Sequence, residues 1–333
     1  MNNNSTHHEL STFAITYLAI ADTVAFVSLV AYGMVCFVLW KYRDGVFNNS
    51  FYKLALSLGL LDMTYLIMQI CFATVEGVVG ESGLPHWFIL FCGGTVNLLA
   101  WTLLLHIIAI SFNRLAAVLL MQKYNQFFTP KKVLMIIGVC YGWAALTVTV
   151  MYGVGCYFHA PSGITYRWTC YLDADMNAVD NAVLYIQIKS IGMPFVVLIM
   201  NILILGTLRR AMKKSASQSS TAGKETSLVI QFGLICLVYF LYIGSYWITE
   251  YLQVQGLLSA NHGEAIVGIF AILNSSLNPF IYFAFSTDIQ KAILGHTGAL
   301  GKTVNITVKS ATKVNPSQGV VSETGFSTKK TRC

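Results

Sequence analysis

Charged residues are scarce in this chain. Only 11% of its 333 residues are Asp, Glu, Lys or Arg, whereas 56% are hydrophobic. Soluble domains carry about 25% charged residues, so the composition excludes an ordinary soluble domain. The scarcity of charge leaves long apolar stretches, and about 20 apolar residues are enough for a helix that spans a bilayer.

Other absences narrow the function. The apolar stretches hold no cluster of His and Asp, no nucleophile paired with a base and no group of metal ligands, so we expect neither an enzyme nor a metal site. His106 is the only histidine inside such a stretch, and we expect it to be packed and hydrogen-bonded. A transporter is the less favoured alternative, because it would show repeats or several intramembrane charges.

Seven apolar stretches predict an all-α membrane protein with seven spanning helices and short loops. No basic residue precedes the first stretch, so we expect it to remain as an anchor instead of being cleaved as a signal peptide. The predicted spans are residues 16–40, 51–75, 87–112, 133–155, 182–208, 227–249 and 264–285.

The connections between these stretches differ in charge. Of the 21 Lys and Arg residues, 19 lie in alternate connections, at the ends next to them or in the tail. Basic residues accumulate on the cytoplasmic side of membrane proteins. With an odd number of spans, this pattern predicts a multi-pass plasma-membrane protein with its N-terminus outside and its tail inside.

The sequence therefore divides into four predicted parts. Residues 1–15 form an extracellular N-terminus, 16–285 the helix bundle, 286–294 an amphipathic helix and 295–333 a disordered cytoplasmic tail. Asn3 and Asn4 both fit Asn-x-Ser/Thr and face outward in this topology, so we expect them to carry glycans. The net charge of +7 indicates contact with anionic lipid head groups, and the scatter of basic residues over loops argues against nucleic acid.

Three cysteines lie toward the predicted outer face, where a disulfide is stable. Cys92 lies near the outer end of the third stretch, and Cys156 and Cys170 lie in the second outer connection. We favour a Cys92–Cys170 pair, because Cys170 lies in the middle of the loop. Cys156 is the alternative partner, and the sequence does not choose between them.

Polar residues inside the apolar stretches are costly in lipid and mark functional positions. Asp62 lies in the second stretch, and we expect an ion or water site beside it, with Na⁺ as the candidate ion. The seventh stretch holds Asn274 and Asn278, which are four residues apart and share a helical face. We predict an Asp62–Asn278 contact that joins the second and seventh helices.

Other polar or helix-bending residues accompany Asp62. Arg114 ends the long apolar third helix. Trp143 is a packing residue of the fourth helix, and Pro194 bends the fifth. Lys189, five residues before Pro194, reaches the surface in one interpretation; in the other it pairs with an acidic ligand or an acid such as Asp180.

These residues resemble the motifs of the rhodopsin-like G-protein-coupled receptors over roughly residues 16–294. Asn278-Pro279-Phe280-Ile281-Tyr282 matches the seventh-helix Asn-Pro-x-x-Tyr motif. Asn113-Arg114-Leu115 is similar to the acidic-Arg-aromatic triplet that closes the third helix. Asp62, Cys92, Trp143 and Pro194 resemble the second-helix aspartate, the third-helix disulfide cysteine, the fourth-helix tryptophan and the fifth-helix proline.

The sequence also departs from the family pattern. Asn113 replaces the acid that would hold Arg114, the sixth helix has no proline, and Ile202 stands where a tyrosine is common. These departures resemble the nematode serpentine chemoreceptors, of class X, V or a related class. No lysine occurs in residues 265–284 and no acid in 88–112, so the resemblance implies neither a retinal-binding opsin nor an amine receptor.

The resemblance implies a receptor for a small external ligand that signals through a heterotrimeric G protein. Chemosensation, with localisation to sensory cilia, is the favoured role, and a neuropeptide or transmitter receptor is the alternative. Glu225 is the expected inactive-state partner of Arg114. The candidate ligand-binding residues are Asn97, Trp101, Lys189, Tyr246 and Trp247.

Overall fold

The structure is a computed structural model that describes residues 12–45, 47–79, 83–120, 123–159, 167–170, 176–214 and 219–296. By its internal contacts the chain divides into two units, residues 1–290 and 291–333. The first unit holds all the long helices, and the described part of the second is the end of one short helix. The predicted glycan sites Asn3 and Asn4 lie outside the described residues.

Seven helical spans in the described part are long and apolar enough to cross a membrane, as the sequence predicted. They are α1 (Thr12–Lys41), α2 with η1 and α3 (Ser50–Val79), α4 (His86–Leu120), α6 (Pro130–Gly153), the Asn177–Thr207 part of α7 (Met176–Lys214), the Gly233–Val254 part of α8 (Ser219–Val254), and α9 with α10 (Ala260–Phe285).

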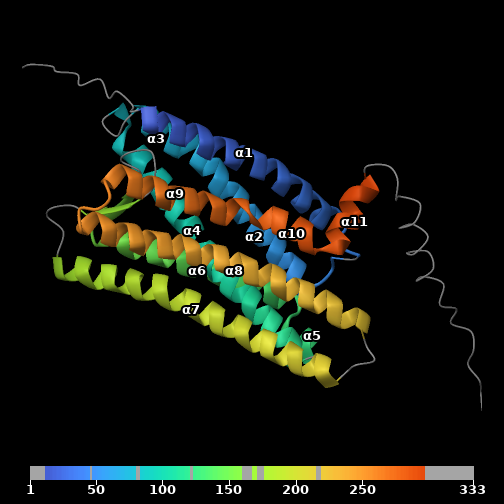
Figure 1. The fold of residues 1–333 in the computed structure, drawn as a ribbon. Helices are drawn as coiled ribbons and strands as arrows, with labels where there is room; N and C mark the ends of the chain where they lie inside the picture. Colours follow the sequence, from blue (N-terminus) through green and yellow to red (C-terminus); the bar gives the residue numbers. More distant parts are fainter. Residues whose placement is uncertain are drawn as a thin grey trace, which may run out of the picture. The chain divides into compact units, whose positions relative to one another are not determined.

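The spanning helices lie side by side along one common direction (Figure 1). Helix α4 is central in this packing, since it contacts α2, α6 and α7. Large apolar side chains such as Phe26 of α1 and Val139 of α6 are exposed along the outer surfaces of the helices, as expected where lipid replaces water.

Two spans depart from a continuous α-helix. The second span contains a π-helical turn, η1 (Gln69–Ala73), between α2 (Ser50–Met68) and α3 (Thr74–Val79). The seventh divides into α9 (Ala260–Ser276) and α10 (Asn278–Phe285), with Pro279 in the first turn of α10. Proline has no backbone N–H to continue the α9 hydrogen bonds, but it fits the start of a helix.

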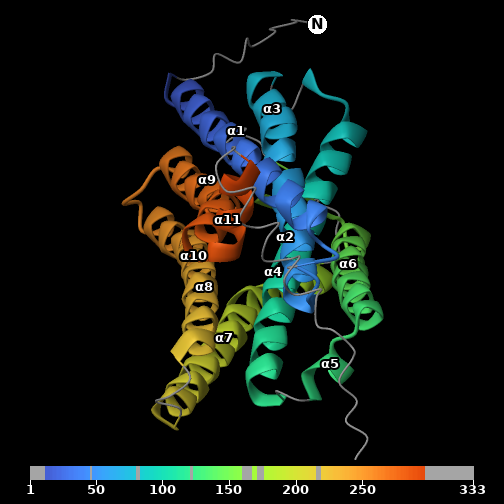
Figure 2. The same cartoon turned by 90° about the vertical axis from the view of Figure 1, so that its right-hand side faces the viewer.

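Short elements mark the two ends of the bundle, and Figure 2 views it from the end that carries α5. At one end, α5 (Tyr124–Phe127) follows α4, and α11 (Thr287–His296) follows α10; we call this the α5 end. Helix α11 covers the predicted amphipathic helix 286–294, and the side chain of Ile289 on it is fully buried. Ser286 caps α11: its Oγ accepts a hydrogen bond from the Ile289 backbone N–H, and its carbonyl accepts one from the Gln290 backbone N–H.

The other end of the bundle carries an antiparallel hairpin of β1 (Cys156–His159) and β2 (Arg167–Cys170); we call it the hairpin end. Gly155, at φ 82°, turns the chain from α6 into β1, a conformation that glycine adopts without a Cβ clash. From the sequence, only a loop is expected between α6 and α7. The register of the hairpin places Cys156 directly opposite Cys170.

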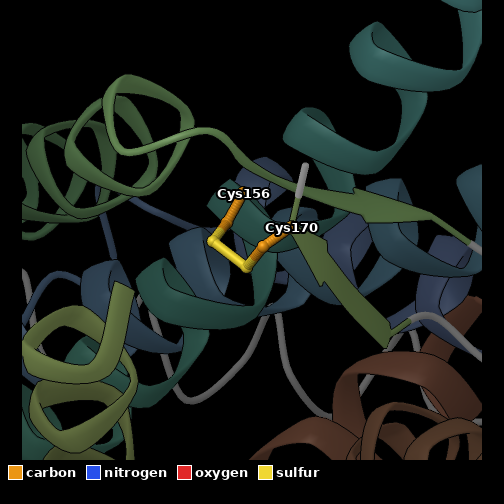
Figure 3. The surroundings of a disulfide bond; sticks show 2 residues. All are labelled: Cys156 and Cys170. Atoms are coloured by element: carbon orange, nitrogen blue, oxygen red, sulfur yellow. A yellow bond between two sulfur atoms is a disulfide. The ribbon is translucent and has the colours of Figure 1, made fainter. Parts of the chain in front are cut away.

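The disulfide joins Cys156 to Cys170 (Figure 3), so the predicted Cys92–Cys170 pair is wrong. The hairpin brings the Cα atoms of Cys156 and Cys170 to 4.0 Å from each other. Cys92 is a buried free thiol that packs with Leu61 and Val96, and Phe158 of β1 packs against this cluster. Packing, and not a covalent bond, therefore holds the hairpin to α4.

We predict that Cys92→Ser leaves the disulfide intact, whereas Cys156→Ser removes it and lowers stability by about 3 kcal/mol, the value typical of a loop of this length. Peptide mapping without reduction identifies the linked pair, and thermal unfolding measures the loss. A Cys92–Cys170 peptide in the wild type would contradict the assignment.

Candidate functional site

Among the residues that the structure describes, the most deeply buried acid is Asp62, which is 0% exposed. Asn278 of α10 donates from Nδ2 to Asp62 Oδ2 over 2.8 Å, which confirms the predicted contact. Tyr32 of α1 donates its hydroxyl to the same oxygen. One carboxylate oxygen of α2 thus receives donors from both α1 and α10.

Tyr32 was not singled out from the sequence. Its hydroxyl lies within hydrogen-bond distance of the Ser275 carbonyl as well, at 2.9 Å, so one proton is shared between Asp62 and the α9 backbone. A tyrosine inside an apolar stretch looks like a packing residue, and its neighbours in the sequence do not mark it. In this structure the tyrosine reaches Asp62 instead.

Arg114 of α4 lies toward the α5 end and is buried. Its guanidinium carbon lies 3.4 Å from the centroid of the Phe51 ring, at the start of α2. A cation on an aromatic face is stabilised by about 2 kcal/mol or more when both are desolvated. Helix α4 continues to Leu120 through six more apolar residues, so the prediction that Arg114 ends the third helix is wrong.

Asn113 points its hydrogen bonds away from Arg114. Its Nδ2 donates to the hydroxyl of Tyr124 on α5 over 2.9 Å and to Ser50 Oγ on α2 over 3.2 Å. Ser50 and Tyr124 are also hydrogen-bonded to each other. Asn113 therefore ties α4 to α2 and to the short helix α5.

Lys189 of α7 is only 5% exposed, so it does not extend to the surface. Its Nζ donates to Thr147 Oγ1 over 2.9 Å and lies 4.1 Å from the centroid of the Trp101 ring. Asp180, the acid suggested as its partner, is exposed. Asn97, one turn from Trp101 on α4, is buried as well.

A family model described as "7 transmembrane receptor (rhodopsin family)" matches residues 31–282. This range includes the Asp62 network, Arg114 and the Asn278–Tyr282 motif. The chain belongs to this family.

The rhodopsin-family receptors are not enzymes, and this receptor is a multi-pass membrane protein of the G-protein-coupled type. No curated protein matches the chain. The resemblance to nematode chemoreceptors stays a prediction.

The remaining predicted site residues are placed as follows. Tyr246 is 48% exposed, and its ring meets Trp247 edge to face, with centroids 5.6 Å apart. Tyr282 is buried in α10. Glu225 belongs to α8, but its side chain lies outside the described part of the receptor, so its pairing with Arg114 stays a prediction.

His106 is buried and hydrogen-bonded, as expected from the sequence. Its Nδ1 lies 2.9 Å from the Thr102 carbonyl oxygen and its Nε2 lies 3.0 Å from Ser57 Oγ. A carbonyl only accepts, so Nδ1 carries the proton and Nε2 accepts from Ser57. This pairing joins α2 to α4 and leaves His106 in a structural role.

The Asn113 network predicts the effect of removing one hydroxyl. Tyr124→Phe leaves Asn113 Nδ2 with a weaker set of acceptors, so we expect a loss of about 1 kcal/mol of stability. Thermal unfolding of the purified receptor measures it. Tyr251→Phe is the matched control, because Tyr251 is 64% exposed. Equal effects of the two substitutions would contradict the network.

Proposed function

We propose that this receptor binds a small external ligand toward the hairpin end and activates a heterotrimeric G protein at the α5 end, with its N-terminus outside the cell. Chemosensation at the plasma membrane, in sensory cilia, is the favoured role. A neuropeptide or transmitter receptor is the alternative within the same family, and the site of expression separates the two.

The observation that carries this proposal is the contact between Arg114 and Phe51. The guanidinium lies inside the helix bundle on an aromatic ring, so it has to leave that ring before it can meet a partner at the α5 end. Ligand shifts a receptor only by binding one of two arrangements better. Release of Arg114 from Phe51 would distinguish the active arrangement from this one.

The arrangement of the polar contacts supports a coupled change. Asp62 joins α1, α2 and α10 in the middle of the bundle, and Asn113 joins α4, α2 and α5. Both sets include α2, which also carries Phe51. A movement of α2 relative to α4 would therefore disturb the Arg114 contact and the Asn113 contact together.

We also propose a Na⁺ or water site beside Asp62. Its second oxygen, Oδ1, and the hydroxyl of Ser276 are buried and have no hydrogen-bond partner among the described residues. Both are hard oxygen ligands of the kind that such cations take. The chemistry of these two groups fits such an ion, which would help hold α2 against α9.

Nucleotide exchange on a purified G protein tests the proposal. We expect Phe51→Leu to raise basal exchange by up to about 30-fold, because loss of a contact of about 2 kcal/mol shifts a two-state equilibrium by that factor. Phe26→Leu, the same change on an exposed residue, is the control and should leave exchange unchanged. We expect Arg114→Ala to abolish exchange.

The same assay tests the predicted Glu225 contact, since Glu225→Gln should raise basal exchange if Glu225 restrains Arg114.

Unchanged exchange in well-folded Phe51→Leu would contradict the role of the ring. Ligand uptake into vesicles without any exchange on G protein would favour a transporter.

A further inference from the structure

Lys189 is a buried cation in the middle of a membrane-spanning helix. Within the described part of the receptor, no carboxylate lies within ion-pair distance of it. A buried ammonium is costly unless it is paired and hydrogen-bonded. An apolar side chain at this position would pack without that cost, so the charge itself needs an explanation.

The surroundings of Lys189 are aromatic. Its Nζ lies 4.1 Å from the ring centroid of Trp101, 5.2 Å from that of Tyr185 and 5.9 Å from that of Trp143. The Thr147 hydroxyl accepts a hydrogen bond from the Lys189 ammonium and donates its own to the Trp143 carbonyl. These groups stabilise a cation, but none of them carries the opposite charge.

Two further donors lie next to this cluster. Trp101 Nε1 and Asn97 Nδ2 are buried side-chain nitrogens without a hydrogen-bond partner among the described residues. Trp101 and Asn97 are four residues apart, so they share one face of α4. The region therefore has an excess of buried hydrogen-bond donors and a positive charge, and it lacks a negatively charged hydrogen-bond acceptor.

We propose that this region of α4, α6 and α7 binds the carboxylate of an otherwise apolar, aromatic or aliphatic ligand, with Lys189 as its charge partner. A carboxylate supplies two oxygens that accept several hydrogen bonds. It would supply the counter-charge that Lys189 lacks and the acceptors that Trp101 Nε1 and Asn97 Nδ2 lack. The flanking rings of Trp101, Trp143 and Tyr185 suit an apolar remainder. This inference rests on the proposed function, since it names the chemical class of the ligand.

A purely structural role for Lys189 is the competing interpretation. In that case the ammonium only joins α4, α6 and α7 through the rings and Thr147, and its substitution changes stability alone. The two interpretations differ in one property, which is the preference of the receptor for an acid over the uncharged amide of the same shape.

The test uses purified receptor and three matched pairs of probes: hexanoic acid and hexanamide, 3-phenylpropanoic acid and 3-phenylpropanamide, and indole-3-acetic acid and its amide. Ligand-induced shifts in unfolding temperature give apparent affinities. We expect at least one acid to bind about tenfold or more tightly than its amide, the factor that one charge-assisted hydrogen bond supplies.

We expect Lys189→Gln to abolish this preference and Lys189→Arg to retain part of it. Lys131→Gln, which removes an exposed lysine at the α5 end, should leave the preference unchanged. No acid preference in the wild type, or the same preference in Lys189→Gln, would overturn the inference.

Nucleotide exchange measured on the same preparations separates this inference from the proposed function. Acid preference without any exchange on G protein would support the carboxylate site and contradict the proposed function. Exchange stimulated equally by an amide and its acid would support the function and overturn the carboxylate site.

Discussion

A carboxylate buried in a membrane protein depends on the protein for its hydrogen bonds, and one oxygen of Asp62 receives them from two other helices. Lipid offers no hydrogen bond to replace either donor. Tyr32 and Asn278 therefore fix where α1 and α10 lie relative to α2. The break between α9 and α10 at Leu277 brings Asn278 into this position, so the proline motif and the acid act as one structural unit.

Two buried cations among the described residues follow a common pattern. Arg114 rests on Phe51, and Lys189 rests on Trp101. Aromatic faces thus help to hold both cations inside the bundle. Such contacts hold a cation more weakly than a full counter-charge does, which leaves Lys189 able to accept a ligand.

Hydropathy and charge were sufficient to predict the spans, because length and apolar composition decide which helices lipid accepts. The ends were less predictable. Helix α4 continues past Arg114 to Leu120 because the residues after the arginine are again apolar, and α7 continues to Lys214 through basic residues beyond its apolar part. The Asp62–Asn278 contact could be predicted because both residues are polar groups that lipid cannot satisfy.

The disulfide and the roles of Tyr32 and Phe51 could not be predicted in the same way. A disulfide depends on register, and the aromatic and β-branched residues of Cys156–His159 and Arg167–Cys170 were a signal for a hairpin that the sequence analysis did not use. Tyr32 and Phe51 look like packing residues in the sequence, because their contacts depend on which helix faces they share with Asp62 and Arg114. Only the packed structure shows these neighbours.

The most direct test of this account is a double-mutant cycle on the Asp62–Asn278 contact, with Asp62→Ala, Asn278→Ala and the double variant compared in free energy of unfolding. The account predicts that the double variant loses about 1.5–3 kcal/mol less than the sum of the two single losses, as for a hydrogen bond to a charged group. Losses that add to within about 0.5 kcal/mol would show that the two residues do not act together and would contradict the account.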